Sequence, residues 1–278
     1  MTPQTAMAAA AVKLRDAGIA DAARDVRLLW DAAMPHRFVD AADLADGVAL
    51  ARFDALIARR MTRIPVSHLL GYRDFYAHRF IVTPDVLDPR PDTETLVAQA
   101  LERPFTRVLD LGTGSGCILL SLLAARRGAT GVGVDYAQAA LDVAAQNVTQ
   151  LGLDAQVTLR QSDWFENVDG EFDLIVSNPP YIAAKEMVDL QPEVQLFEPR
   201  LALTDEADGL ECYRKIIARH DHFLQSGGWL MVEIGPSQGA AVSQMMTDAG
   251  LLHVSVIPDM DARDRVVIGQ KKHVKRPI

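Results

Sequence analysis

From Arg107 onward the chain alternates short strand patterns with helical patterns, and this alternation constrains the fold more than any other feature of the sequence. It predicts an α/β fold: a mostly parallel sheet with helices on both faces. The last two strands flank the polar turn 259–264, which predicts an antiparallel hairpin at one sheet edge. The predicted strands are 108–111, 131–134, 157–160, 174–177, 229–234, 252–257 and 265–269.

The first 64 residues or so predict a small helical bundle instead. Asp21 is the expected N-cap of a helix that ends at Pro35. A further helix is expected over 49–62, before Pro65. The apolar stripes of the two helices are Ala22, Val26, Leu29 and Ala33 in the first, and Leu50, Phe53, Leu56, Ile57 and Met61 in the second.

Aromatic and β-branched runs at 69–76 and 79–82 predict a hairpin that links two domains. We therefore expect an N-terminal domain over residues 1–83 and a catalytic domain over 84–278. The first range holds 11 Lys and Arg against 9 Asp and Glu, and the second holds 17 against 28. The difference is compatible with a bundle that docks an acidic partner, or with a solvated helix face that carries Arg59, Arg60 and Arg63.

Composition excludes several classes of protein. A net charge of −9 over 278 residues argues against a surface that binds nucleic acid throughout, although a local basic patch stays compatible with it. No apolar stretch reaches the length of a membrane span, and the N-terminus lacks a signal-peptide pattern, so we expect a cytoplasmic protein. Cys117 and Cys212 are expected to be small buried residues, and His220 and His222 lack companion ligands, so no metal site is predicted.

A glycine-rich turn follows the strand at 108–111 and leads into an apolar helix. It reads Gly112-Thr113-Gly114-Ser115-Gly116, and such a turn lets a ligand approach the backbone closely. The spacing differs from that of dinucleotide folds, and no phosphate-binding lysine follows. About 20 residues on, Asp135 ends the next strand, where a carboxylate can accept from both hydroxyls of a ribose. Together these features favour an adenosine-type cofactor.

Two further polar loops end strands of the predicted sheet. Asp163 and Trp164 offer an acceptor for an adenine amino group and a flat stacking wall, or are simply a loop acid beside a core tryptophan. Asn178-Pro179-Pro180-Tyr181 follows the strand at 174–177, and the carboxyl ends of such strands are where ligands bind.

The loop at 178–181 is rich in hydrogen-bond acceptors, because neither proline has an N–H group. Acceptors of this kind suit a planar NH₂ substrate, an amide or an amino group on a base, and Tyr181 adds an aromatic face that attracts a cation such as a sulfonium. The plain alternative is a proline-rich turn in which Asn178 caps a local bend.

In their order and spacing, these loops resemble a class I S-adenosylmethionine-dependent methyltransferase that acts on an exocyclic or amide nitrogen. The segments 65–71, 90–94, 198–203 and 208–210 resemble, more narrowly, the release factor glutamine methyltransferase family over nearly the whole chain. One departure is visible: Ala262 stands before Arg263-Asp264-Arg265, where the family often has a glycine. Its effect is expected to stay within that turn.

The resemblance implies a Rossmann-like methyltransferase sheet behind an N-terminal helical domain. It implies methyl transfer from S-adenosyl-L-methionine to N5 of the glutamine in the Gly-Gly-Gln loop of peptide chain release factors, and so a role in translation termination. The catalytic residues would be Asn178, Pro179, Pro180 and Tyr181. Gly112 to Gly116, Asp135, Asp163, Trp164 and Asn178 would hold the cofactor. We expect a monomer that binds its protein substrate transiently and binds neither nucleic acid nor membrane.

Three alternatives remain open on the sequence. A glutamine methyltransferase acting on a ribosomal protein would share the pocket. An adenine methyltransferase of DNA or RNA would need a basic channel to capture the base. A non-catalytic cofactor-binding module would have no use for the loop at 178–181.

Two polar segments have structural expectations of their own. The segment Arg90 to Glu94 is expected either to cap a helix through Asp92 or Thr93 or to line the pocket entrance. Glu198 and Arg200 are expected to form an ion pair.

Overall fold

The computed structural model describes residues 2–34 and 47–273. The helix end expected at Pro35 lies outside the described residues. The chain divides into two compact units, one of residues 1–72 with 191–197, the other of residues 73–190 with 198–278. The domain boundary expected near Thr83 stays a prediction, and the inclusion of 191–197 in the first unit was not foreseen.

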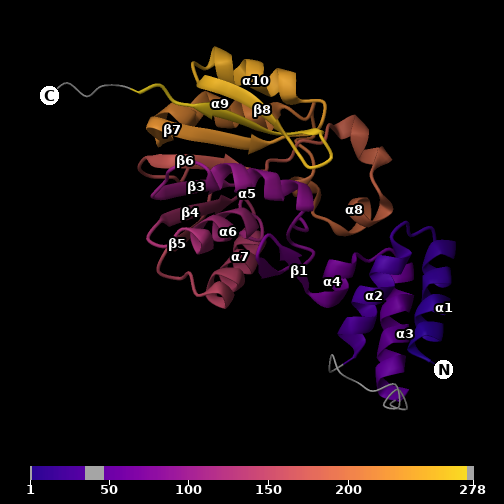
Figure 1. Ribbon diagram of the computed structural model, residues 1–278. Coiled ribbons are helices and arrows are strands. Elements are labelled where there is room, and N and C mark those ends of the chain that lie inside the picture. Colours follow the sequence, from indigo (N-terminus) through magenta and orange to yellow (C-terminus); the bar gives the residue numbers. More distant parts are fainter. Residues whose placement is uncertain (1, 35–46, 274–278) are drawn as a thin grey trace. The chain divides into compact units, whose positions relative to one another are not determined.

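The first unit is a cluster of helices around a small apolar core (Figure 1). The predicted stripe of the helix that follows Asp21 is confirmed, because Ala22, Val26, Leu29 and Ala33 are all buried. Phe53 and Ile57 are buried as predicted, whereas Met61, at the end of its helix, is 42% exposed. Asp21 makes no side-chain capping bond. The helices are α1 (Pro3–Asp16), α2 (Ala22–Ala33), α3 (Gly47–Met61), α4 (Val66–Leu70) and α8 (Pro192–Phe197).

Arg60 is buried in this unit, so the interpretation of a solvated face with three arginines is wrong for it. Its Nε donates to Asp25 Oδ2 at 2.7 Å and its Nη2 to Glu193 Oε1 at 3.0 Å. Arg63 Nη1 also donates to Glu193 Oε1, at 3.2 Å. Because Glu193 lies in α8, these charged hydrogen bonds attach a segment distant in the sequence to the helical unit.

The predicted hairpin is present as strands β1 (Tyr72–Phe75) and β2 (His78–Ile81). Its first strand starts later than expected, because Leu69 and Leu70 belong to α4. That helix ends at Gly71, whose φ of 77° gives the left-handed cap that releases the chain into the strand.

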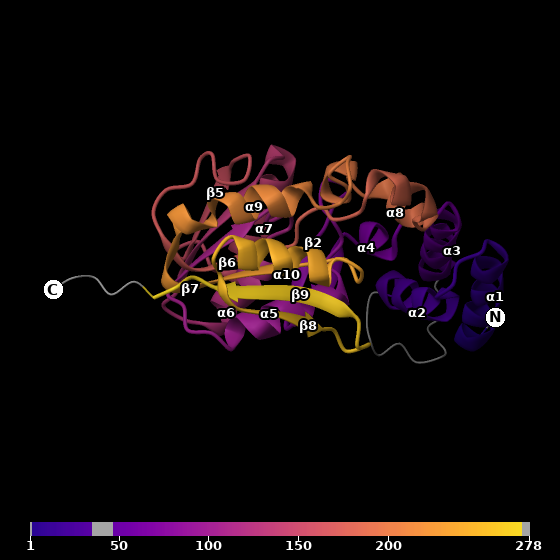
Figure 2. The same cartoon turned by 90° about the horizontal axis from the view of Figure 1, so that it is seen from above.

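The second unit is built on a seven-stranded sheet in the order β5-β4-β3-β6-β7-β9-β8. Neighbouring strands from β5 to β7 pair in parallel, and β9 pairs antiparallel with both β7 and β8. Figure 1 shows β5 to β7 from bottom to top, and Figure 2 shows β8 and β9 from above. The predicted fold class is confirmed, hairpin edge included. The bounds are β3 (Arg107–Leu111), β4 (Thr130–Asp135), β5 (Val157–Gln161), β6 (Phe172–Ser177), β7 (Leu224–Glu233), β8 (Leu252–Pro258) and β9 (Asp264–Gln270).

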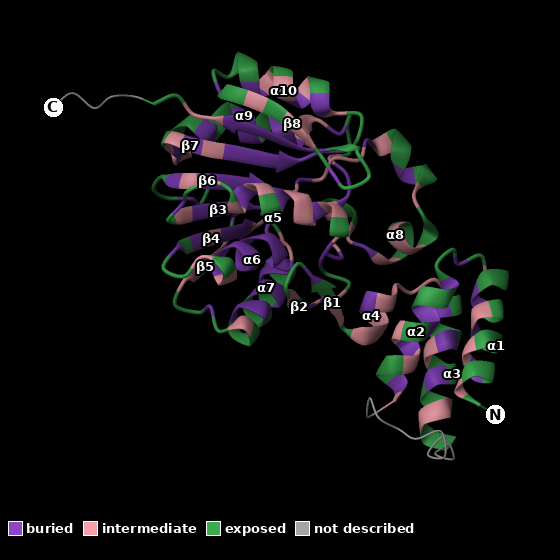
Figure 3. Ribbon diagram, in the orientation of Figure 1, coloured by how far each residue is buried: buried purple, intermediate pink, exposed green. Residues whose placement is uncertain are grey.

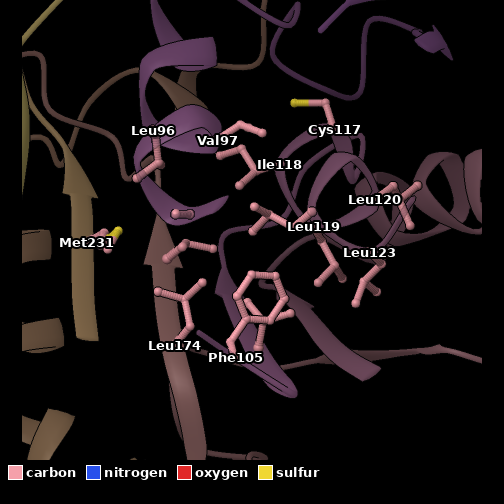
Figure 4. Packing of buried hydrophobic residues seen from close by; sticks show 14 of the residues in the cluster. Leu96, Val97, Phe105, Cys117, Ile118, Leu119, Leu120, Leu123, Leu174 and Met231 are labelled. Carbon is pink, nitrogen blue, oxygen red and sulfur yellow. The ribbon is translucent and has the colours of Figure 1, made fainter. Parts of the chain in front are cut away.

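Side chains that alternate along the strands enter two cores, one on each face of the sheet. Figure 3 shows the strands β3, β6 and β7 mostly in the colour of buried residues. Val108 packs with α5, α6 and α7 in the first core, and Leu109 packs with α9 and α10 in the second. Figure 4 shows leucines of α6 beside Phe105 in the first core. The helices are α5 (Glu94–Leu101), α6 (Cys117–Ala125), α7 (Gln138–Leu151), α9 (Glu211–Phe223) and α10 (Gly239–Asp248).

Short 3₁₀ turns complete the unit: η2 (Pro91–Thr93), η3 (Ala184–Asp189) and η4 (Arg200–Ala202). Thr93 stands at the start of α5, but its side chain does not cap that helix as the sequence suggested. Its hydroxyl accepts a hydrogen bond from Asn178 instead. Among the described residues, no helix is long and apolar enough to cross a bilayer.

Candidate active site

A pocket of about 440 Å³ lies at the carboxyl ends of the parallel strands, within the second unit. Its volume is in the range of small-molecule sites. The sequence-predicted residues that line it are Gly112, Thr113, Gly114, Ser115, Asp135, Asp163, Trp164, Asn178 and Pro180. Loops that follow β3, β4, β5 and β6 thus meet around one space, as strand-end placement predicts.

The glycine-rich turn forms one wall of the pocket. Gly112 has a φ of 71° and Gly114 a φ of 54°, and a Cβ on either would meet no atom within 4 Å, so open space lies over both. Gly116 faces inward, since a Cβ there would approach Leu120 Cδ1 at 3.1 Å. Thr113 Oγ1 donates to Asp110 Oδ2 at 2.7 Å, which fixes the turn to the end of its strand.

Asp135 holds the turn from the neighbouring strand. Its Oδ2 accepts from Gly114 N at 2.9 Å and its Oδ1 from Ala137 N at 3.0 Å. Burial raises the pKa of this carboxyl, while the hydrogen bonds from the backbone of Ala137 and Gly114 act to lower it. A carboxylate has about four lone-pair sites, so two remain for hydroxyl groups of a ligand.

Asn147, which the sequence analysis did not single out, fixes the outer side of the turn. It is fully buried on α7, and its Nδ2 donates to Ile81 O at 3.0 Å and to Ser115 O at 2.9 Å. Its Oδ1 accepts from Ile81 N at 2.7 Å. One amide therefore ties β2 to the glycine-rich turn.

The loop at 178–181 lies next to that turn because β6 pairs with β3. Ser177 Oγ donates to Leu111 O at 2.6 Å, which joins the two strand ends. Asn178 Nδ2 donates to Thr93 Oγ1 at 3.3 Å. The amide oxygen lies across the group from its nitrogen, so Asn178 can present Oδ1 to the pocket that it lines.

Tyr181 lies elsewhere, because its ring packs against the second core. Its hydroxyl lies 3.4 Å from Oε1 of the buried Glu233, and its carbonyl accepts from Gln238 Nε2 at 2.9 Å. Burial, followed by the charge of Glu233, raises the pKa of Tyr181, which stays a neutral phenol. Neither Tyr181 nor the buried Pro179 contributes to the pocket wall, so their contact with the reacting centre stays a prediction.

Asp163 is exposed at the pocket rim and Trp164 is partly buried in the second core. Trp164 adopts a φ of 50°, and its carbonyl accepts from Ser162 Oγ at 2.9 Å. Tyr136, which follows Asp135 and also lines the pocket, was not predicted from the sequence. Its side chain is 62% exposed, and a single exposed aromatic residue does not stand out in a hydrophobic pattern.

The ion pair expected between Glu198 and Arg200 does not form, because each has another partner. Arg90 Nη2 donates to Glu198 Oε1 at 2.6 Å, and Arg200 Nε donates to Glu206 Oε1 at 2.5 Å. Arg90 also lines the pocket, so the segment 90–94 both borders the pocket and starts a helix. Cys117 and Cys212 are buried as predicted, and burial raises the pKa of each thiol to about 12.

Comparison with known proteins agrees with this geometry. Residues 85–197 match the family described as "Methyltransferase small domain", and residues 5–71 match the "PrmC N-terminal domain". A methyltransferase of Pyrococcus furiosus superposes with a TM-score of 0.51 at 18% identity, over 79% of this chain and 98% of that one, which shows the fold. Sheet, glycine-rich turn and strand-end acid together define a class I methyltransferase.

The full-length relatives narrow this class. The release factor glutamine methyltransferase of Cereibacter sphaeroides is 50% identical over 96% of this chain and 98% of its own length. That of Caulobacter vibrioides is 38% identical over 100% of this chain and 99% of its own. The chain belongs to the release factor glutamine methyltransferase family.

The pocket fits the cofactor that such an enzyme uses. The open space over Gly112 and Gly114 admits a ligand against the backbone, and Asp135 faces it with unused acceptor sites. Polar and apolar side chains share the pocket wall, Thr113 and Asp163 with Trp164 and Ile118. These residues suit a nucleoside with an amino acid chain.

Proposed function

We propose that this protein transfers a methyl group from S-adenosyl-L-methionine to the N5 side-chain nitrogen of the glutamine in the Gly-Gly-Gln motif of a peptide chain release factor. The observation that carries the proposal is the Asn178 carboxamide in the pocket wall, held by Thr93 through its nitrogen. The names of the full-length relatives support the substrate.

On this proposal, Asp135 accepts from the ribose hydroxyls, Asp163 accepts from the adenine amino group, and Trp164 offers the stacking wall. The pocket-lining turn residues Gly112 to Ser115 lie against the rest of the cofactor, whereas Gly116 faces the protein interior beside Leu120. When bound, the cofactor supplies an electrophilic methyl group and leaves as a neutral thioether.

The chain's own task is to make an amide nitrogen reactive, since its lone pair is shared with the carbonyl. Asn178 Oδ1 and the Pro179 carbonyl accept the two N–H hydrogens of the glutamine, which orients the nitrogen for in-line attack. As the N–C bond forms, positive charge grows on nitrogen, and both acceptors stabilise that charge more in the transition state than in the ground state. The charged nitrogen then loses a proton to water, so no strong base is needed. Holding both reactants in line supplies much of the rate.

We propose that the protein acts in the cytoplasm as a monomer, that its N-terminal unit contributes to recognition of the release factor, and that it forms no stable complex with nucleic acid. A stable dimer in solution scattering would contradict the monomer.

Transfer of a labelled methyl group tests the proposal. The acceptors are purified release factor, its Gly-Gly-Ala variant, a ribosomal protein mixture and duplex DNA. Label on intact release factor alone is the expected result. Label on ribosomal protein or on DNA would show that the protein is a methyltransferase but that its substrate is not the release factor.

A further inference from the structure

A buried carboxyl lies behind Asn178 and takes no part in the chemistry above. Glu233 ends β7 and is 1% exposed. Its Oε1 lies 3.4 Å from the Tyr181 hydroxyl, whereas its Oε2 makes no hydrogen bond of ordinary geometry with the described residues. A buried carboxyl with an unpaired oxygen is costly, so its presence beside the Tyr181 hydroxyl calls for a physical reason.

Thr93 connects this carboxyl to Asn178. Its side chain is buried, its Oγ1 accepts from Asn178 Nδ2 at 3.3 Å, and its hydrogen bonding toward Glu233 acts to lower the pKa of that acid. A hydroxyl has one hydrogen to donate, and an ionised carboxylate can only accept. A Thr93 hydroxyl that donates its one hydrogen to Glu233 can then only accept from Asn178.

We propose that Glu233, acting through Thr93, is a positioning residue that fixes the direction of the Asn178 carboxamide. The relay runs from the Asn178 N–H to the Thr93 hydroxyl and on to the Glu233 carboxylate, which leaves Asn178 Oδ1 for the substrate amide. Without the carboxylate, Thr93 could donate to Asn178 Oδ1, and the amide would turn its NH₂ group toward the substrate. The inference rests on the proposed function, because it assigns a direction to the proposed clamp.

The ionisation of Glu233 is set by its surroundings. Burial raises its pKa to about 7, against the Thr93 hydrogen bond and the charge of Arg265. Protonated Glu233 could donate to Thr93, and Thr93 could then donate to Asn178 Oδ1, which turns the amide the wrong way for the substrate. Methyl transfer should therefore rise as pH passes through about 7 and Glu233 loses its proton. The groups that face it from the packed elements are Asp92, Thr93, Cys117, Tyr181, Tyr213 and Arg265.

Steady-state kinetics on folded variants test the relay. Glu233→Gln keeps the shape but can donate, and Thr93→Val keeps the shape but removes the hydroxyl. We expect each to lower kcat by roughly tenfold or more, with cofactor Kd within about twofold of wild type. Thr93→Ser should restore kcat to within about threefold, and the pH limb near 7 should vanish in Glu233→Gln. The exposed Glu166→Gln is the matched control.

Several outcomes would overturn the relay. They are a wild-type kcat in Glu233→Gln, a Thr93→Ser variant as slow as Thr93→Val, or loss of cofactor affinity together with kcat, which would make the role structural. Wild-type protein that labels no release factor would instead overturn the proposed function, and the relay with it. Normal labelling with a fully active Glu233→Gln would overturn the relay alone.

Discussion

At the scale of single residues, the four members of the loop at 178–181 have different surroundings. Asn178 and Pro180 reach the pocket wall, Pro179 is buried, and Tyr181 packs into the core beside Glu233. Neighbouring residues of the loop have different surroundings because one side of the loop faces the pocket and the other side faces the core that contains α9 and α10. Asn178 is therefore the residue proposed for the chemistry, and Asp135 the residue proposed for cofactor binding.

Replacing Asn178 by alanine should remove most methyl transfer, because one of the two acceptors for the substrate amide is lost. We expect kcat to fall by more than roughly tenfold, about 1.4 kcal/mol of barrier, with little change in cofactor affinity. Single-turnover assays and calorimetric titration measure the two effects separately. A fall smaller than this would refute the amide clamp.

Replacing Asp135 by alanine should act on cofactor binding first. The change removes the acceptors proposed for the ribose and also the bond to Gly114 N. We expect cofactor Kd to rise by roughly tenfold or more, the worth of charge-assisted hydrogen bonds. Calorimetry is the measurement, and an unchanged Kd would remove Asp135 from the ribose role.

At the scale of elements, the site depends on strand ends that are tied to one another. Ser177 joins β6 to β3, Asp135 joins β4 to the glycine-rich turn, and Asn147 joins α7 to β2 and to that turn. Each bond closes a connection between segments far apart in the sequence. The wall around the cofactor pocket is therefore held from several elements at once, which favours a preformed site.

The turn between β8 and β9 explains the departure at Ala262. This residue has a φ of 60°, a conformation that glycine adopts without strain. Ala262→Gly should therefore stabilise the protein, by up to about 1 kcal/mol. Ala249→Gly, at a φ of −78°, is the matched control and should destabilise. Urea unfolding measures both, and a loss of stability in Ala262→Gly would contradict this reading of the turn.

At the scale of the whole molecule, the sheet and the place of the pocket at its strand ends could be predicted from the sequence, together with part of the pocket wall. Runs of apolar residues predict buried strands such as 174–177, and the polar residues that follow these strands lie at one edge of the sheet. Tertiary partners could not be predicted. Glu193 joins the helical unit, and Glu198 pairs with Arg90 rather than Arg200, because nothing local in the sequence specifies a contact more than 100 residues away.

Buried acids should make the protein less stable as pH rises from about 4 to about 7. Burial raises the pKa of both Asp110 and Glu233 to about 7, above the values of an unfolded chain. In that window the folded state binds more protons than the unfolded state, so the free energy of unfolding falls with rising pH. Unfolding midpoints at pH 5.5 and 7.5 should show the fall, and Asp110→Asn should reduce it. If the unfolding midpoint of Asp110→Asn changes between the two pH values as much as that of the wild type, Asp110 is not a cause of the fall.

Tandem mass spectrometry of a release factor, after incubation with the protein and S-adenosyl-L-methionine, locates the transferred methyl group. We expect one added methyl group on the side-chain nitrogen of the Gly-Gly-Gln glutamine, and much less of it in the same time when Asn178→Ala replaces the wild type. A methyl group on another residue, or an unmodified glutamine under conditions in which cofactor binds, would contradict this expectation.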